Sequence, residues 1–295
     1  MENELTFAQQ AEAYLADIAS VARPNTLHVY RSLLTNRILP AIGGLEMEAV
    51  DNLAVKSLVS RLAEAELSPA TINLTVTLVK QIVKSAVDKR GNPRYPVQWN
   101  GSFIKAPKVE PESQKAPICP LGTLQTALDG TSGDTQALIL LLASTGLRIG
   151  ETLAIGRGNA WDPEAGTITV QGTMIDGEFQ PAPKTKAGKR VVDLHPEVSV
   201  LLKALYPSEE ARKGTLFPMS EDTYRNRIDR LGIPGFHSLR RFRITHLQMN
   251  EAPETLTKFW AGHAAKDVTE RYTKVKSQVE ARKVWTEKAG LGFTL

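Results

Sequence analysis

The sequence predicts a mainly α-helical protein with a small antiparallel β-sheet, divided into two domains. Three observations predict this class. Apolar side chains recur at helical spacing through residues 7–85, a proline-rich stretch comes next, and short alternating segments typical of strands occur only between residues 167 and 194. A chain of 295 residues is long enough to build two domains, each with its own core.

Composition limits the classes of protein to which the chain can belong. The apolar fraction is 42% and the charged fraction 23%, values typical of a soluble globular protein. The net charge of +4 favours a polyanionic partner, although only weakly. Cys119 is the only cysteine, which excludes an internal disulfide and a zinc site of several cysteines.

The sequence also bears on location. Its first residues, Met1-Glu-Asn-Glu, are acidic where a secretory signal would be basic, and the most apolar run, 137–143, is too short to cross a bilayer. We therefore expect a cytoplasmic protein without a membrane anchor.

Four helices are predicted in the first domain. The first covers residues 7–18, the second comes after Arg23-Pro-Asn and is stopped by Pro40, and the third covers residues 52–66. The fourth begins with Ser68 as its cap and Pro69 at its first position. It runs to a basic end at Lys84, Lys89 and Arg90, and these residues together with Lys80 offer cations to a phosphate backbone. Four helices over this length predict a small bundle.

A linker is predicted next, because prolines are frequent from residue 92 to 120 and no apolar face repeats there. We place the first domain at 1–106, the linker at 107–118 and the second domain at 119–295. In the second domain we expect helices at 121–128 and 135–144, strands at 167–171, 178–181 and 190–194, and mainly helix after Pro196. A turn between the last two strands carries Lys184, Lys186 and Lys189.

The stretch 237–275 contains the densest set of candidate functional residues. His237 and Arg240 are three apart and share a face at the start of a helix, where free N–H groups favour an anion. A second helix ends near Gly262 and presents His263. Tyr272 comes nine residues later among Arg271, Lys274 and Lys276, surroundings better suited to attack on a phosphodiester than to a core.

Cleavage of a phosphodiester without a metal needs cations around the phosphate, an acid and a nucleophile. Arg148 and Arg240 can bind the oxygens, the lysine turn and two histidines can move protons, and Tyr272 can attack. No paired carboxylates with metal-ligand spacing accompany them, so we predict neither a metal nor another cofactor.

Four motifs occur in order: TGLRIGE at 145–151, PKTKAGKR at 183–190, HSLRRF at 237–242, and AGH with Tyr272 after eight further residues. Together they resemble the tyrosine recombinase family, of the phage integrase and Xer type. The resemblance covers nearly the whole chain, and it implies a SAM-like, helical core-binding domain and then a mixed α/β catalytic domain. One departure is Ala261, where the family usually has leucine.

The resemblance also implies roles for individual residues. Arg148 and Arg240 correspond to the arginines that clamp the scissile phosphate, and His237 and His263 to the family's two histidines. Tyr272 corresponds to the nucleophile, and Lys186 to the lysine that protonates the leaving oxygen, with Lys184 as the alternative and an exposed hairpin as the ordinary reading. Glu151 either orients Arg148 or forms an exposed ion pair with it. Phosphate-backbone contacts are further expected from Lys184, Arg241 and Arg243.

The predicted function is site-specific DNA recombination through a 3′-phosphotyrosyl intermediate, by a homotetramer on two DNA duplexes. The C-terminal helix, 278–288, docks either on a neighbouring subunit or on its own domain. Two alternatives remain: an enzyme of the type IB topoisomerase kind, which nicks and reseals one duplex, and a non-catalytic DNA-binding regulator. The sequence specifies neither the target site nor the choice among integration, excision and dimer resolution.

Overall fold

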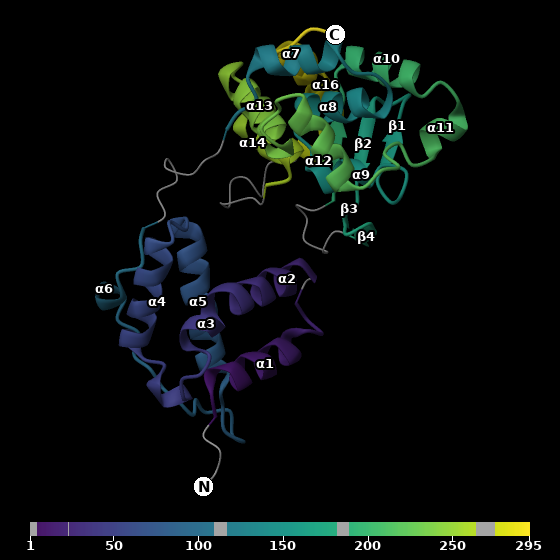
Figure 1. The fold of residues 1–295 in the computed structure, drawn as a ribbon. Helices are drawn as coiled ribbons and strands as arrows, with labels where there is room; N and C mark the ends of the chain where they lie inside the picture. Colours follow the sequence, from purple (N-terminus) through teal and green to yellow (C-terminus); the bar gives the residue numbers. More distant parts are fainter. Residues whose placement is uncertain (1–4, 23, 109–116, 182–188, 264–274) are drawn as a thin grey trace. The chain divides into compact units, whose positions relative to one another are not determined.

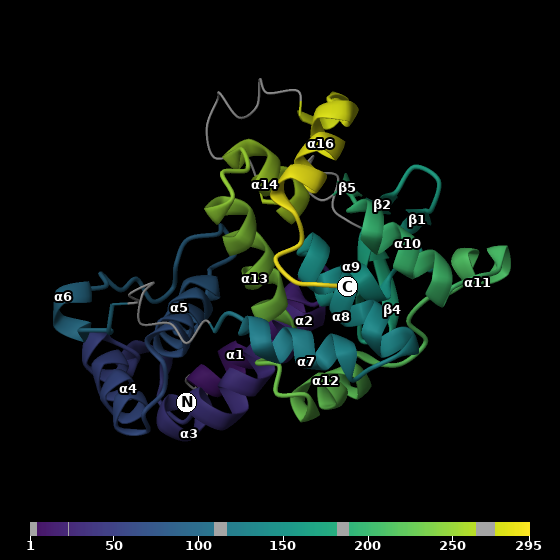
Figure 2. The ribbon, with the colours of Figure 1, turned by 90° about the horizontal axis from the view of Figure 1, so that it is seen from above.

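A computed structural model describes residues 5–22, 24–108, 117–181, 189–263 and 275–295. The chain divides into two compact units, 1–115 and 116–295, and each has its own hydrophobic core (Figures 1 and 2). The predicted class, mainly helical with little antiparallel sheet, is confirmed. The predicted boundaries of the domains and the linker stay a prediction.

The first unit is a bundle of helices around α5. Its α-helices are α1 (Phe7–Ile18), α2 (Pro24–Leu33), α3 (Leu39–Ile42), α4 (Asn52–Glu64), α5 (Pro69–Ser85) and α6 (Gly101–Ile104). Helices α1 and α4 pack against α5, which buries one face, including Ile72, Leu78 and Val83, while Leu74 is exposed. The ends agree with the predicted caps: the Ser68 hydroxyl accepts a hydrogen bond from the Thr71 N–H at 3.2 Å.

Pro40 does not stop the second helix, contrary to the prediction. A π-helical turn, Leu34–Ile38, joins α2 to α3, and the Leu39 N–H donates to the carbonyl of Leu34, five residues back. A π turn offsets the ladder of backbone bonds by one residue, and Pro40 at the start of α3 lies where a missing N–H costs little.

Two further expectations for this unit are corrected. The proline-rich stretch that begins at residue 92 does not run free of the bundle from its start. Up to residue 106 it packs on the first unit, because Ile104 on α6 is buried and Tyr95, Val97 and Trp99 pack against the same core. The basic residues do not all lie on α5, which ends at Ser85. Arg90 lies in a tight turn beyond it, where its N–H donates to the Asp88 carboxylate at 2.7 Å.

The second unit is built around α8 (Gly133–Thr145), which is buried on all sides from Ala137 to Thr145. Helices α7 (Leu121–Asp129), α10 (Pro196–Leu205) and α13 (Phe236–Met249) pack against it. The other α-helices described in this unit are α9 (Ile149–Leu153), α11 (Glu209–Lys213), α12 (Glu221–Arg230), α14 (Glu254–Ala261) and α16 (Val279–Ala289). Short 3₁₀ turns lie at Met47–Ala49 in the first unit and at Val275–Ser277 in the second.

The strands form two antiparallel sheets among the described residues. One has the order β1 (Ala160–Asp162), β2 (Thr167–Val170), β5 (Arg190–Asp193), and the other pairs β3 (Gly172–Ile175) with β4 (Glu178–Pro181). The expectation that the last two predicted strands are neighbours is wrong, because β5 pairs with β2, with Val170 opposite Arg190. Strands β1 and β3 were not predicted. No helix in the described ranges is long and apolar enough to span a membrane.

Candidate active site

The site begins where α8 gives way to α9. Gly146 ends α8 in the left-handed conformation, with φ of 69°, and Arg148 caps α9. The Glu151 carboxylate accepts the Arg148 backbone N–H at 2.9 Å and its guanidinium Nη1 at 3.1 Å. Gly150 lets α9 approach β3, since a Cβ there would lie 2.2 Å from the Thr173 hydroxyl. One short turn therefore fixes both the backbone and the side chain of Arg148.

Glu151 is buried, at 7% exposure, whereas the Arg148 side chain is 43% exposed. The expected alternative of an exposed i,i+3 ion pair is therefore wrong for Glu151. Its two oxygens accept from the Arg190 fork, at 3.0 Å to Nη1 and 2.8 Å to Nη2. Burial acts to raise the pKa of Glu151, but the hydrogen bonds and charge of Arg190, together with Arg148, outweigh it and lower that pKa. The carboxylate is thus held ionised.

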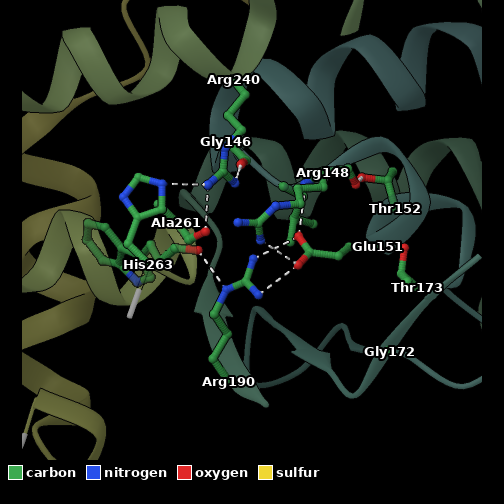
Figure 3. A network of polar contacts seen from close by, with 12 residues as sticks. Gly146, Arg148, Glu151, Thr152, Gly172, Thr173, Arg190, Arg240, Ala261 and His263 are labelled. Carbon is green, nitrogen blue, oxygen red and sulfur yellow. Dashed lines mark hydrogen bonds and ion pairs between the residues drawn. The ribbon is translucent and has the colours of Figure 1, made fainter. Parts of the chain in front are cut away.

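Arg190 extends the network from β5 to the end of α14 (Figure 3). Its Nε donates to the Trp260 carbonyl at 2.8 Å. Gly262, which ends α14 with φ of 66°, lies directly on this guanidinium, because an added Cβ would be 2.7 Å from the Arg190 Cζ. Only glycine satisfies both constraints without strain, so this packing also fixes how the chain enters His263.

Arg240, on α13, is deeply buried, with 3% exposure. Its Nη1 donates to the Gly146 carbonyl at 2.5 Å, and Nη2 donates to the Ala261 carbonyl at 2.7 Å and contacts the His263 Nε2 at 3.0 Å (Figure 3). Within the described part of the chain, no carboxylate forms an ion pair with it. Burial, and after it the charge of Arg148, lowers the pKa of Arg240 to about 10, which still leaves it charged at neutral pH.

The two predicted histidines are solvent-exposed, and the charge of Arg240 acts on both. Burial of part of each ring, and after it the charge of Arg240, lowers the pKa of both His237 and His263, so both are neutral at neutral pH. Because an arginine can only donate, the His263 Nε2 accepts from Arg240 and the ring proton sits on Nδ1. Nδ1 is therefore the ring's available donor.

This arrangement is suited to binding an anion. Three guanidinium groups, those of Arg148, Arg190 and Arg240, lie near the carboxylate of Glu151, but only Arg148 and Arg190 form ion pairs with it. A buried charge without a counter-ion is costly, and an anion that enters beside Arg240 and the partly exposed Arg148 removes that cost. Two planar forks on a preorganised scaffold match a phosphate better than a point charge would.

The remaining predicted residues lie at several places. Lys184, Lys186 and Tyr272 lie outside the described residues. Arg241 is partly exposed and donates to the Pro117 carbonyl at 3.2 Å. Lys84, Lys89 and Arg90 are exposed in the first unit, and Lys80 is partly buried, with its ammonium 5.4 Å from the centre of the Trp99 ring.

The structure contradicts the prediction for Arg243. We expected it to contact the DNA backbone, but it is buried at 3% exposure and donates to the Gly290 carbonyl at 2.6 Å. It therefore anchors the C-terminal end of the chain instead of facing solvent.

Sequence reasoning missed Arg190. The available signal was an arginine directly before two valines at the start of a strand, where a buried charged side chain needs a partner. Its partners lie 39 and 70 residues away along the chain, so spacing did not reveal them.

A helical bundle joined to a mixed α/β unit, with a buried arginine cluster at the α8–α9 turn and the start of α13, defines the tyrosine recombinase class. The chain belongs to the phage integrase family, whose profile matches residues 122–278. A second profile, the N-terminal SAM-like domain of phage integrases, matches residues 6–63. No curated protein matches the sequence significantly.

Solved structures of similar fold include two integrases. The Tn1549 transposon integrase in complex with circular intermediate DNA has a TM-score of 0.68 at 18% identity, over 94% of this chain and 98% of that one. The lambda integrase tetramer bound to a Holliday junction has a TM-score of 0.63 at 16% identity, over 90% of this chain and 80% of that one. At these identities the likeness shows the fold alone.

Proposed function

We propose that the protein is a site-specific DNA recombinase that cuts and rejoins strands through a covalent link to Tyr272. The Tyr272 oxygen attacks a DNA phosphorus, the bond to the 5′ oxygen breaks, and a 3′-phosphotyrosyl link and a free 5′-hydroxyl result. That hydroxyl later attacks the phosphotyrosyl link of a partner strand and releases the tyrosine. The ester bond is exchanged and not hydrolysed, so the reaction needs neither ATP nor a metal.

The observation that carries the proposal is the buried Arg240, which is held by two carbonyls and an imidazole beside the partly exposed Arg148. The proposed role of both arginines is to hold the non-bridging oxygens as negative charge grows on them. Glu151 orients Arg148, and His263 and His237 bond the phosphate or the attacking oxygen. Lys186 gives its proton to the departing 5′ oxygen, with Lys184 as the alternative donor.

We propose double-stranded DNA as the partner, held by phosphate contacts from Lys80, Lys84, Lys89, Arg90, Lys184 and Arg241. The similar lambda structure is a tetramer on a Holliday junction, and we propose the same stoichiometry, a tetramer on two duplexes, for this chain. In the described structure α16 packs on its own unit, yet Val279 and Val284 on it are exposed, at 40% and 61%. These two side chains are candidates for the subunit interface.

The test uses a duplex recovered by the purified chain from random-sequence DNA, nicked near the cut site so that religation is blocked. We expect an SDS-resistant protein–DNA adduct with the wild type, formed equally in EDTA, and none with Tyr272→Phe. Binding without an adduct in the wild type, or an adduct with Tyr272→Phe, would refute the covalent role.

A second assay separates recombination from simple nicking and resealing. Two sites on one plasmid should yield exchanged products, and the complex with short duplexes should have the mass of four chains and two duplexes by light scattering. Relaxation of supercoils by a monomer without exchanged products would favour a topoisomerase-like enzyme instead.

A further inference from the structure

Arg190 connects the α8–α9 turn, which carries Arg148, to the end of α14, which leads to His263. It is not among the residues proposed to touch the phosphate. On one side its fork bonds both oxygens of Glu151, which in turn bonds Arg148. On the other its Nε bonds the carbonyl of Trp260, three residues before His263. Figure 3 shows the Arg190 guanidinium below that of Arg148, facing the Glu151 carboxylate.

The geometry requires a guanidinium. Arg190 makes three hydrogen bonds in fixed directions, and its side chain is 2% exposed. A lysine has the charge but not the planar fork, so it cannot bond both carboxylate oxygens and the Trp260 carbonyl in this arrangement. The close approach of Gly262 leaves little room for the side chain to move.

The surroundings of Glu151 predict the effect of removing Arg190. The charged groups that act on this carboxylate are Arg190 on β5, Arg148 at the start of its own helix and Arg240 on α13. Burial, the largest influence, favours the protonated form, and Arg190 opposes it most strongly. Without Arg190 the carboxyl takes up a proton more readily, and a neutral carboxyl holds Arg148 less firmly.

We propose that Arg190 is a positioning residue for DNA cleavage: it holds Glu151, and through it Arg148, while fixing the end of α14 that carries His263. The inference rests on the proposed function and adds to it a residue whose effect on the phosphate is indirect. It predicts that loss of Arg190 slows the chemical step while DNA still binds.

The experiment measures two quantities on the same nicked duplex: the dissociation constant, and the single-turnover rate of adduct formation at saturating protein from pH 5.5 to 8.5. The variants are Arg190→Met, Arg190→Lys, Glu151→Gln and the double variant Arg190→Met/Glu151→Gln. The matched control is Arg243→Met, since Arg243 is equally buried, at 3% exposure, and also bonds a backbone carbonyl but does not bond Glu151. Circular dichroism and the unfolding midpoint report folding.

We expect Arg190→Met to reduce the rate by about 10- to 100-fold, the effect typical of losing a group that orients a functional side chain. DNA affinity should stay within about twofold, a change too small to account for that slower rate. The ratio of the Arg190→Met rate to the wild-type rate should fall further as the pH is lowered, because Glu151 then becomes protonated. In the double variant this added pH dependence should disappear, since glutamine does not titrate. Arg190→Lys should lose less, and Arg243→Met should add no pH dependence.

Several results would overturn the assignment. The assignment fails if Arg190→Met reacts at the wild-type rate. It also fails if the added loss of rate at low pH persists in the double variant, or if Arg243→Met shows the same loss at low pH. If Arg190→Met does not fold, Arg190→Lys takes its place, with a reduced rate supporting the assignment and a wild-type rate overturning it. Absence of an adduct in the wild type would instead overturn the proposed function, and the role of Arg190 with it.

Discussion

At the scale of single residues, Arg148 and Arg240 have the same proposed task but different surroundings. Arg148 is partly exposed and held by Glu151, whereas Arg240 is buried and bonds the carbonyls of Gly146 and Ala261. Arg148 therefore serves mainly to bind the phosphate, whereas Arg240 also ties the ends of α8 and α14 to α13.

Alanine at either position should separate these contributions. We expect both Arg148→Ala and Arg240→Ala to lower the rate of adduct formation by at least about 10²- to 10³-fold, as for removal of one oxyanion donor. Only Arg240→Ala should also lower the thermal unfolding midpoint clearly, because two buried carbonyls lose their donor. Arg225→Ala, which breaks an exposed ion pair with Glu221 on α12, is the control and should change neither quantity. Equal destabilisation by the two alanines would contradict this reading.

The buried carboxylate gives a second prediction at this scale. Glu151→Gln leaves Arg190 buried without a counter-ion, so the free energy of unfolding at pH 7 should fall by about 3–5 kcal/mol. The folded pKa of Glu151 lies below the ordinary 4.5, so its stabilising effect is complete above that pH and is lost as the pH falls further. Urea unfolding of both proteins from pH 7 to 3 should show a gap that narrows only below about 4.5.

Glu221→Gln, at an exposed pair, should show no such gap. A constant gap for Glu151→Gln down to pH 3 would rule out ionisation as the source of the stability.

The sequence predicts roles for Arg148 and Arg240 but not for Arg190, and the reason is physical. The first two occur in short motifs whose spacing is local to a turn or a helix. The function of Arg190 depends on Glu151 and Trp260, which are distant in the chain and come together only through folding. The burial of Arg243 was missed for the same reason, because its acceptor, Gly290, lies 47 residues further on.

At the scale of elements, helices were easier to predict than strand pairing. Caps such as Ser68 and Gly262 mark helix ends locally, and α1, α5 and α14 begin or end where their sequences indicated. The two valines of β5 favour a strand but do not show which strand it pairs with. Chain order suggested β4, whereas the register places β5 against β2. Strand β1 has only three residues, too few for any alternation to be visible, whereas β3 is as long as the strands that were predicted and its length does not explain why it was missed.

A buried ion pair helps to hold the C-terminal helix α16 in its own unit. Arg282 donates to Asp193 on β5 through Nε at 2.8 Å and Nη2 at 3.1 Å, and Trp260 donates to the same carboxylate at 2.7 Å. Arg282 also donates to the Val275 carbonyl at 3.3 Å. The end of α14 and the start of the C-terminal segment are thus both tied to β5.

Removal of this pair should loosen α16. Arg282→Met leaves Asp193 buried without its cation, and we expect the free energy of unfolding to fall by about 3–5 kcal/mol. Val284→Ala on the exposed face of the same helix should cost less than about 0.5 kcal/mol. Hydrogen exchange should show faster exchange across residues 279–289 in the first variant only, and unchanged exchange there would mean that other interactions hold the helix.

At the scale of the whole molecule, the two units carry different kinds of positive charge. The second unit holds Arg190 and Arg240 buried in a fixed network with Arg148, whereas Lys84, Lys89 and Arg90 in the first unit are exposed. Exposed cations strengthen binding to phosphates without specifying sequence, and buried ones act on a single bound group. The family and the class of fold could be predicted from sequence because the motifs of the second unit and the helical periodicity of the first are both local patterns, but this division of charge required burial to be known.

The division predicts that affinity and chemistry can be changed separately. Replacing Lys84, Lys89 and Arg90 together with alanine should weaken DNA binding and reduce the slope of log affinity against log salt by up to about 0.9 for each phosphate that is no longer neutralised. At saturating DNA the single-turnover rate should stay close to wild type, because the arginine cluster is untouched. Arg148→Ala should do the reverse, with a small change in the salt slope and a large drop in rate.

The matched control is Lys213→Ala, which removes an exposed lysine paired with Glu209 on α11 and should alter neither quantity. A triple variant with an unchanged salt slope would show that the first unit meets DNA through other residues. A triple variant that binds normally but cleaves slowly would contradict the division itself, since exposed charges would then be acting on the chemical step.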